Sequence, residues 1–182
     1  MAEGVLGVAY PRAALIGNPS DGFGGKTIAF VFSDFHAEVR LEEHDRIEVL
    51  PGRVDHLDWD NLEEFQGSVS SMGYYGGLRL LKATLFVFIE YCKENDITLH
   101  NRGFKLSYGT DIPVLLGLSG SSAIIAACLR ALGTWYKVKM KSWQLADLAW
   151  RVETEELKIP AGLQDRVAQA YNHPVFMDFD QG

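Results

Sequence analysis

The chain has 182 residues, a net charge of −7 at neutral pH and 47 % hydrophobic residues. This composition is typical of a folded globular domain and excludes a disordered chain. The acidic balance argues against a broad nucleic-acid or membrane-surface footprint, so we expect no nucleic acid and no membrane as partners. Charged residues interrupt the longest apolar run and no signal segment is recognisable, so we predict a cytoplasmic location.

The first half of the chain is predicted to consist mostly of strands, because short apolar or alternating runs are separated by turn residues. The predicted strands are residues 5–10, 12–16, 26–32, 37–41 and 46–50. Residues 54–66 are acidic and aromatic without a clear period, which indicates a surface excursion.

The second half is predicted to be rich in helices, because its apolar residues recur with helical spacing. The predicted helices are residues 77–95, 123–136, 142–157 and 161–171, and two further strands are predicted at residues 104–108 and 175–179. Ser142 is of the type preferred at a helix N-cap. Cys92 and Cys128 lie within apolar helical patterns, so we expect two free, buried thiols and no disulfide.

The strongest functional signal is the loop at residues 113–123, which is rich in small residues and runs into an apolar, helix-prone segment. The first N–H groups of a helix have no partner within the helix, and the helix dipole favours an anion there. Gly117 and Gly120 let the backbone approach a phosphate closely. An ordinary helix start with a serine cap fits this stretch equally well when it is taken alone.

A second glycine-rich stretch, residues 24–27, superficially matches the end of a P-loop. A P-loop requires a glycine five residues before the glycine that precedes the lysine, and that position is Ser20. The residues that follow are predicted to form a strand where a P-loop requires a helix. We therefore exclude a P-loop.

Three segments together resemble the GHMP kinase superfamily of galacto-, homoserine, mevalonate and phosphomevalonate kinases. They are residues 11–25, 113–123 and 152–166, and the stretches 91–96, 117–123 and 161–169 are most similar to the glucuronokinase family within it. The resemblance implies an α+β fold, that of the GHMP kinase N-terminal domain and of domain 2 of ribosomal protein S5, over residues 1–182. It also implies ATP-dependent phosphorylation of the anomeric hydroxyl of D-glucuronate, with ATP and Mg²⁺ required.

The resemblance further implies residue roles. Asp165 aligns with the base for the sugar hydroxyl, Arg12 with a residue that stabilises charge on the transferring group, and Asp21 with a sugar-hydroxyl acceptor. Ser122 and Glu153 align with the Mg²⁺ ligands. The residues implied to wrap the nucleotide phosphates are Gly117, Leu118, Ser119, Gly120, Ser121, Ser122 and Ala123.

Each of these residues also has a purely structural interpretation. Asp165 and Arg166 could form an exposed charge pair on a helix, and Glu153 could belong to a solvated helix face. Arg12 could lie on the surface, and Asp21 could be an ordinary turn residue. The occurrence of all three segments in the family's order favours the functional interpretation.

Two departures from the family pattern leave alternatives open. Asn18 and Pro19 stand where galactokinases carry Glu-His, which puts galactose in doubt as the substrate. No third glycine-rich motif follows Asp165, so we expect a domain whose partner kinase domain is missing from this chain. The alternatives are a truncated, non-catalytic nucleotide- or sugar-binding fragment, or a GHMP kinase for another sugar. Arg79 and Arg166 are candidates for binding the sugar carboxylate, and residues 72–77 for lining the adenine pocket.

Overall fold

The structure is a computed structural model, and it describes residues 4–52, 55, 60–72 and 76–180. The strands are β1 (Val5–Ala9), β2 (Arg12–Ile16), β3 (Lys26–Val31), β4 (Ala37–Glu43), β5 (Glu48–Val49), β6 (Phe104–Thr110) and β7 (Val175–Asp178). The helices are α1 (Leu62–Met72), α2 (Gly77–Glu94), α3 (Gly120–Tyr136), α4 (Ser142–Arg151) and α5 (Gln164–Tyr171), with a 3-10 helix at Ser20–Phe23 and a π-helical turn at Val152–Glu156.

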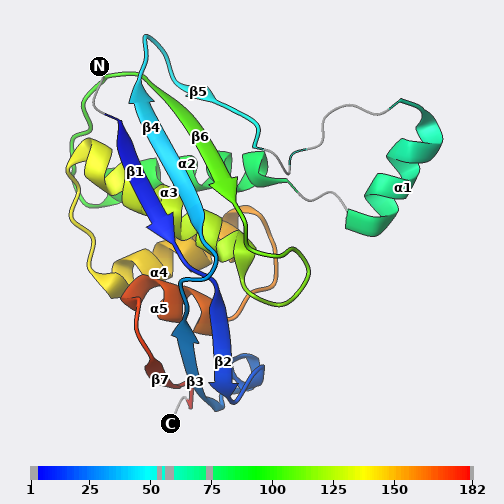
Figure 1. The fold of residues 1–182 in the computed structure, drawn as a ribbon. Coiled ribbons are helices and arrows are strands. Elements are labelled where there is room, and N and C mark those ends of the chain that lie inside the picture. Colours follow the sequence, from blue (N-terminus) through cyan, green and yellow to red (C-terminus); the bar gives the residue numbers. More distant parts are fainter. Residues whose placement is uncertain (1–3, 53–54, 56–59, 73–75, 181–182) are drawn as a thin grey trace.

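The strands form two sheets that the chain joins directly (Figure 1). The larger sheet has the order β1-β4-β6-β5; β1, β4 and β6 pair antiparallel, and β5 pairs with β6 in parallel. The smaller sheet is antiparallel with the order β2-β3-β7. Only Tyr10 and Pro11 separate β1 from β2, so Arg12 lies where the two sheets meet.

Helix α3 forms the centre of the core because it is apolar on nearly all sides, as a buried helix must be. It packs against β1 and β4 on the inner face of the larger sheet, with α2 and α4 beside it (Figure 1). Helix α5 covers the smaller sheet, where Ala168 contacts Ala29 and Met177. This packing fixes the first turns of α3 and α5, and those turns carry Ser121, Ser122 and Asp165 of the predicted site.

The α+β class is confirmed, and most of the predicted elements are present. The surface excursion predicted at residues 54–66 is confirmed for residues 60–66, which are all exposed, and its later part forms the start of helix α1 at Leu62, which the sequence analysis did not predict. Residues 53–54 and 56–59 lie outside the described residues.

Two helix starts and one helix cap also differ from the predictions. Helix α3 begins at Gly120, three residues early, because Ser121 and Ser122 join its first turn. Helix α5 begins at Gln164, three residues late, since residues 161–163 form a connecting turn. Ser142 is the first residue of α4, and the cap position belongs to Lys141, whose backbone N–H is accepted by the Gln144 side chain at 2.9 Å.

Cys92 and Cys128 are both buried and free, which confirms the prediction for the thiols. Within the described ranges, every helix is too short or too polar to cross a lipid bilayer. The cytoplasmic location stays a prediction.

Candidate active site

The three segments singled out in the sequence meet at one end of α3. The backbone N–H of Arg12 donates to the carbonyl of Leu118 at 3.1 Å, which joins β2 to the small-residue loop. The buried amide of Gln169 on α5 donates to the carbonyls of Tyr10 and Ser119, both at 3.0 Å. These bonds hold the sheet junction, the loop and α5 in a fixed relation.

The loop before α3 leaves the start of that helix open to a ligand. Gly117 has a φ of 69°, a left-handed conformation that favours glycine. Ser119 at the N-cap is also left-handed and makes no side-chain cap. The first N–H groups of this 17-residue helix therefore keep their capacity to bind an anion.

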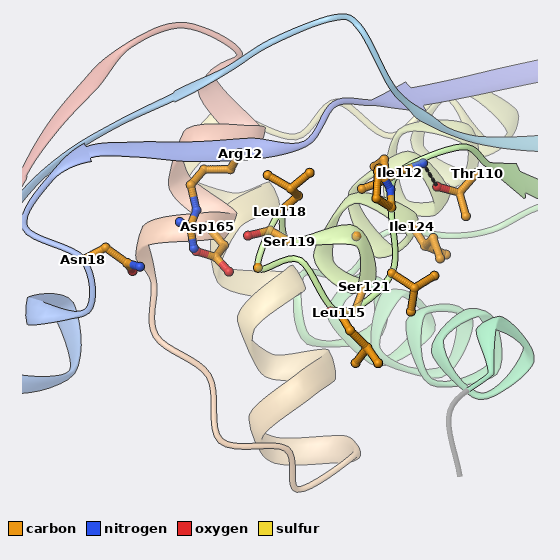
Figure 2. Close-up of a pocket in the computed structure, with 14 residues that line it drawn as sticks. Arg12, Asn18, Thr110, Ile112, Leu115, Leu118, Ser119, Ser121, Ile124 and Asp165 are labelled. Carbon is orange, nitrogen blue, oxygen red and sulfur yellow. Dashed lines mark hydrogen bonds and ion pairs between the residues drawn. The ribbon is translucent and has the colours of Figure 1, made fainter. Parts of the chain in front are cut away.

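A hollow of about 380 Å³ lies over this helix start (Figure 2). The loop residues Gly117 to Ser121 line one side of it, and Arg12 and Asp165 line another. Two polar atoms of lining residues, Ser119 Oγ and Arg12 Nε, are buried without a hydrogen-bond partner among the described residues. Native proteins rarely leave such atoms unpaired, so these two atoms indicate that a polar ligand belongs here.

The Arg12–Asp165 ion pair lies at the edge of this hollow, with the Arg12 side chain 8 % exposed and the Asp165 side chain 19 % exposed. Nη1 of Arg166 approaches the other oxygen of Asp165 to 3.4 Å. The predicted base and the predicted charge-stabilising residue are therefore in direct contact. Arg12, Asp165 and Arg166 are all largely buried. This excludes the interpretations of Asp165 and Arg166 as an exposed charge pair and of Arg12 as a surface residue.

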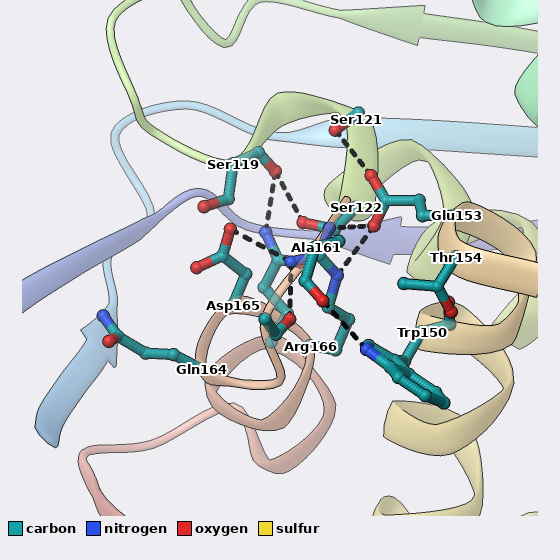
Figure 3. Close-up of polar contacts among 12 residues, drawn as sticks. Ser119, Ser121, Ser122, Trp150, Glu153, Thr154, Ala161, Gln164, Asp165 and Arg166 are labelled. Atoms are coloured by element: carbon teal, nitrogen blue, oxygen red, sulfur yellow. Dashed lines mark hydrogen bonds and ion pairs between the residues drawn. The ribbon is translucent and has the colours of Figure 1, made fainter. Parts of the chain in front are cut away.

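Glu153 is 2 % exposed and is bound from two sides (Figure 3). Its Oε2 accepts from Nε of Arg166 at 2.7 Å and from Nη2 of the same residue. Its Oε1 accepts from the hydroxyl of Ser121 at 3.0 Å. The π-helical turn carries this residue, and such turns often occur at functional sites.

The two predicted metal ligands are not placed alike. Ser122 is fully buried, lines neither hollow, and its hydroxyl donates to the carbonyl of Ser119 at 3.1 Å. Ser121, one residue earlier, is the serine that faces Glu153 (Figure 3). The role of Ser122 stays a prediction, and the geometry favours Ser121.

Ser121 and Glu153 offer hard oxygen donors of the kind that Mg²⁺ takes. An octahedral ion with ligands at about 2.0–2.1 Å holds neighbouring donors about 3 Å apart, which matches the separation of Ser121 Oγ and Glu153 Oε1. Among the described residues, no group of three or more His, Cys, Asp or Glu side chains forms a metal cage.

A second, polar hollow of about 300 Å³ adjoins the first. It includes Asp21, Glu153 and Arg166, and it shares four residues with the first hollow: Arg12, Asn18, Ser121 and Asp165. Oδ2 of Asp21 accepts from the backbone N–H of Gln164 at 3.3 Å, so Asp21 caps α5, the helix that carries Asp165. Gly162 packs against the Asp21 carboxylate and leaves no room for a Cβ atom.

Most of the predicted site residues thus line one of the two hollows. Ala123 is an exception, because it is buried in the packed face of α3. Arg79 lies on α2 and lines neither hollow, and residues 73–75 of the predicted adenine pocket lie outside the described residues. Sequence reasoning missed the packing of Gly162 against Asp21 and the hydrogen bonds from Gln169 to Tyr10 and Ser119. Both depend on contacts between segments that are distant in the sequence.

The fold and the site define an α+β domain in which a carboxylate–arginine pair borders a hollow over the uncapped start of a buried helix. The family profile described as "GHMP kinases N terminal domain" matches residues 79–173, and the chain belongs to this family.

Two curated relatives match nearly the whole chain. "Glucuronokinase 1" of Arabidopsis thaliana is 43 % identical over 176 residues, which are 95 % of this chain and 48 % of that protein. "Probable glucuronokinase 2" of the same plant is 44 % identical over 177 residues, with the same coverage. The chain spans about half the length of these curated relatives.

Solved structures confirm the fold. A D-glycero-D-manno-heptose 1-phosphate kinase from Bacteriodes thetaiotaomicron matches with a TM-score of 0.72 at 22 % identity, over 96 % of this chain and 56 % of that one. The mevalonate kinase of Methanococcus jannaschii matches with a TM-score of 0.68 at 19 % identity, over 100 % of this chain and 55 % of that one.

Proposed function

We propose that this domain belongs to an ATP-dependent sugar kinase that phosphorylates the anomeric hydroxyl of D-glucuronate and yields D-glucuronate 1-phosphate. The observation that carries the proposal is the position of Arg12, Ser121 and Asp165, which line both hollows. Phosphates at the start of α3 and a sugar in the polar hollow would meet at these residues. The similarity to the two Arabidopsis proteins supports glucuronate as the sugar.

The chemistry follows from this arrangement. The anomeric hydroxyl gives its proton to the carboxylate of Asp165 while its oxygen forms a bond to the γ-phosphorus of ATP. The bond from that phosphorus to the bridging oxygen breaks, and ADP leaves. The guanidinium of Arg12 and the N–H groups at the start of α3 stabilise the charge on the transferring group. When bound, a Mg²⁺ ion held by Ser121 and Glu153 would neutralise charge on the phosphates.

A substrate panel tests the proposal. The purified chain is incubated with MgATP and either D-glucuronate, D-galacturonate, D-glucose or D-galactose, and the products are identified by ³¹P NMR. We expect ADP and a phosphorus signal coupled to the anomeric proton, with D-glucuronate the preferred sugar. Phosphate on another hydroxyl, or equal transfer to the neutral hexoses, would contradict the assignment.

The half-length match to the relatives favours one second candidate, a nucleotide- and sugar-binding domain that does not turn over alone. Folded protein that binds MgATP and D-glucuronate without phosphate transfer would support this candidate over the kinase.

A further inference from the structure

The charges around the polar hollow are already paired with one another. Its charged side chains are the carboxylates Asp21, Glu153 and Asp165 and the guanidiniums Arg12 and Arg166. Arg12 is bound to Asp165, and Arg166 is bound to Glu153. The remaining Nη1 of Arg166 donates to the carbonyl of Gly162 at 2.8 Å.

An anionic sugar therefore meets a hollow in which carboxylates outnumber guanidiniums. Both candidate cations from the sequence are unsuited to its carboxylate, because Arg166 is committed to Glu153 and Arg79 lies outside both hollows. Lys26 is held by Asp178 at 2.8 Å and also lies outside them. The other guanidinium of the hollow, Arg12, is bound to Asp165. Among the described residues, a neutral hydrogen-bond donor is therefore the remaining candidate for binding the sugar carboxylate.

Asn18 has the required position and chemistry. It lines both hollows and is exposed, and no hydrogen bond engages its side-chain amide within the described residues. Figure 2 shows Asn18 on the segment after β2, with its amide directed toward the Arg12–Asp165 pair. The amide offers two N–H donors, and a bond from such a donor to a carboxylate is assisted by the negative charge.

We propose that Asn18 binds the carboxylate of the sugar acid through its side-chain amide and so selects uronates over neutral hexoses. The inference rests on the proposed function, since it assumes that a sugar acid occupies the polar hollow. A carboxylate at position 18 would instead add a fourth negative side chain and repel the substrate.

The test compares the binding of D-glucuronate and D-glucose by titration monitored with NMR, which requires no catalytic turnover. The variant Asn18→Asp keeps the shape of the side chain and replaces its donor by a negative charge. The matched control Asn101→Asp adds the same charge on the exposed loop before β6, at the end of that strand away from Thr110 in the hollow.

We expect Asn18→Asp to weaken D-glucuronate binding about tenfold or more, as loss of a hydrogen bond to a charged group does. Binding of D-glucose should be unchanged in this variant, and Asn101→Asp should behave like the wild type with both sugars. An equal effect of Asn18→Asp on both sugars, or no effect, would overturn the role of Asn18 and leave the proposed function standing. A wild-type chain that binds neither sugar would contradict the proposed function itself.

Discussion

The hydroxyl of Ser121 donates a hydrogen bond to Oε1 of Glu153 at 3.0 Å, although 32 positions separate the two residues in the sequence. The bond joins the first turn of α3 to the π-helical turn after α4. It brings together two hard oxygen donors at the start of α3.

Replacement of Ser121 by alanine should therefore weaken the binding of Mg²⁺ and raise the Mg²⁺ concentration that nucleotide binding requires. We expect the Mg²⁺ concentration for half-maximal binding of ATP to rise about tenfold or more, because loss of a supporting group alone costs about 10–100-fold in metal affinity. A calorimetric titration of ATP at several Mg²⁺ concentrations measures this. Ser122→Ala is the matched control: it removes the buried bond to the carbonyl of Ser119 and should cost about 1 kcal/mol of stability without changing the Mg²⁺ requirement. A larger Mg²⁺ effect from Ser122→Ala would reverse the assignment.

Gly162→Ala should destabilise the domain by about 1–3 kcal/mol, the usual cost of forcing an added group into a packed site. The new Cβ atom would collide with the carboxylate of Asp21, which caps α5. Urea unfolding of the single variants and of the double variant with Asp21→Ser identifies the cause. The loss from Gly162→Ala should shrink in the Asp21→Ser background by about 0.5 kcal/mol or more, as expected for residues in contact. Strictly additive losses would show that the collision with Asp21 is not the reason.

Arg166→Met should cost about 3–5 kcal/mol of unfolding free energy, because it leaves the buried carboxylate of Glu153 without its cation. The double variant Arg166→Met with Glu153→Gln should recover part of this loss. Arg151→Met is the control, since it removes an arginine whose partner Glu94 lies in solvent, and it should have a much smaller effect. Chemical denaturation of the four proteins gives the comparison. Equal losses from Arg166→Met and Arg151→Met would contradict the account of the buried pair.

The two thiols should resist alkylation in the folded protein. Burial raises the pKa of Cys92 from its ordinary value of 9.0 to about 11 and raises the pKa of the fully buried Cys128 as well. Since the thiolate is the reactive form, iodoacetamide at pH 8 should modify neither residue in native protein and both in urea. Intact-protein mass spectrometry counts the adducts. A native chain modified at Cys128 would show that α3 is less tightly packed than described.

The sequence was sufficient for the order of elements and for most of the residues that meet at the site. Hydrophobic periodicity depends on local spacing, so it placed β1 through β4 and the long helix α2 within a few residues. Arg12, Glu153 and Asp165 were found because their motifs occur together in one order. Their ion pairs, by contrast, depend on how β2 and α5 pack, which local spacing does not determine.

The choice between Ser121 and Ser122 shows what local reasoning lacks. Both serines belong to the same short run, and either side chain can bind a metal ion. Helix α3 begins at Gly120, so its first turn directs the two hydroxyls to different sides. One side faces Glu153 and the other faces the core, and only the docking of α3 against the π-helical turn separates them.

The most direct test of the central claim is the rate of phosphate transfer from MgATP to D-glucuronate by the wild-type chain and by Asp165→Asn, measured in a single turnover. The substitution keeps the size of the side chain and removes its capacity to accept the proton. We predict a rate loss of about 10²–10⁴-fold, the usual contribution of a general base, with ATP affinity unchanged. Transfer by Asp165→Asn at the wild-type rate would contradict the role of Asp165 and the mechanism built on it.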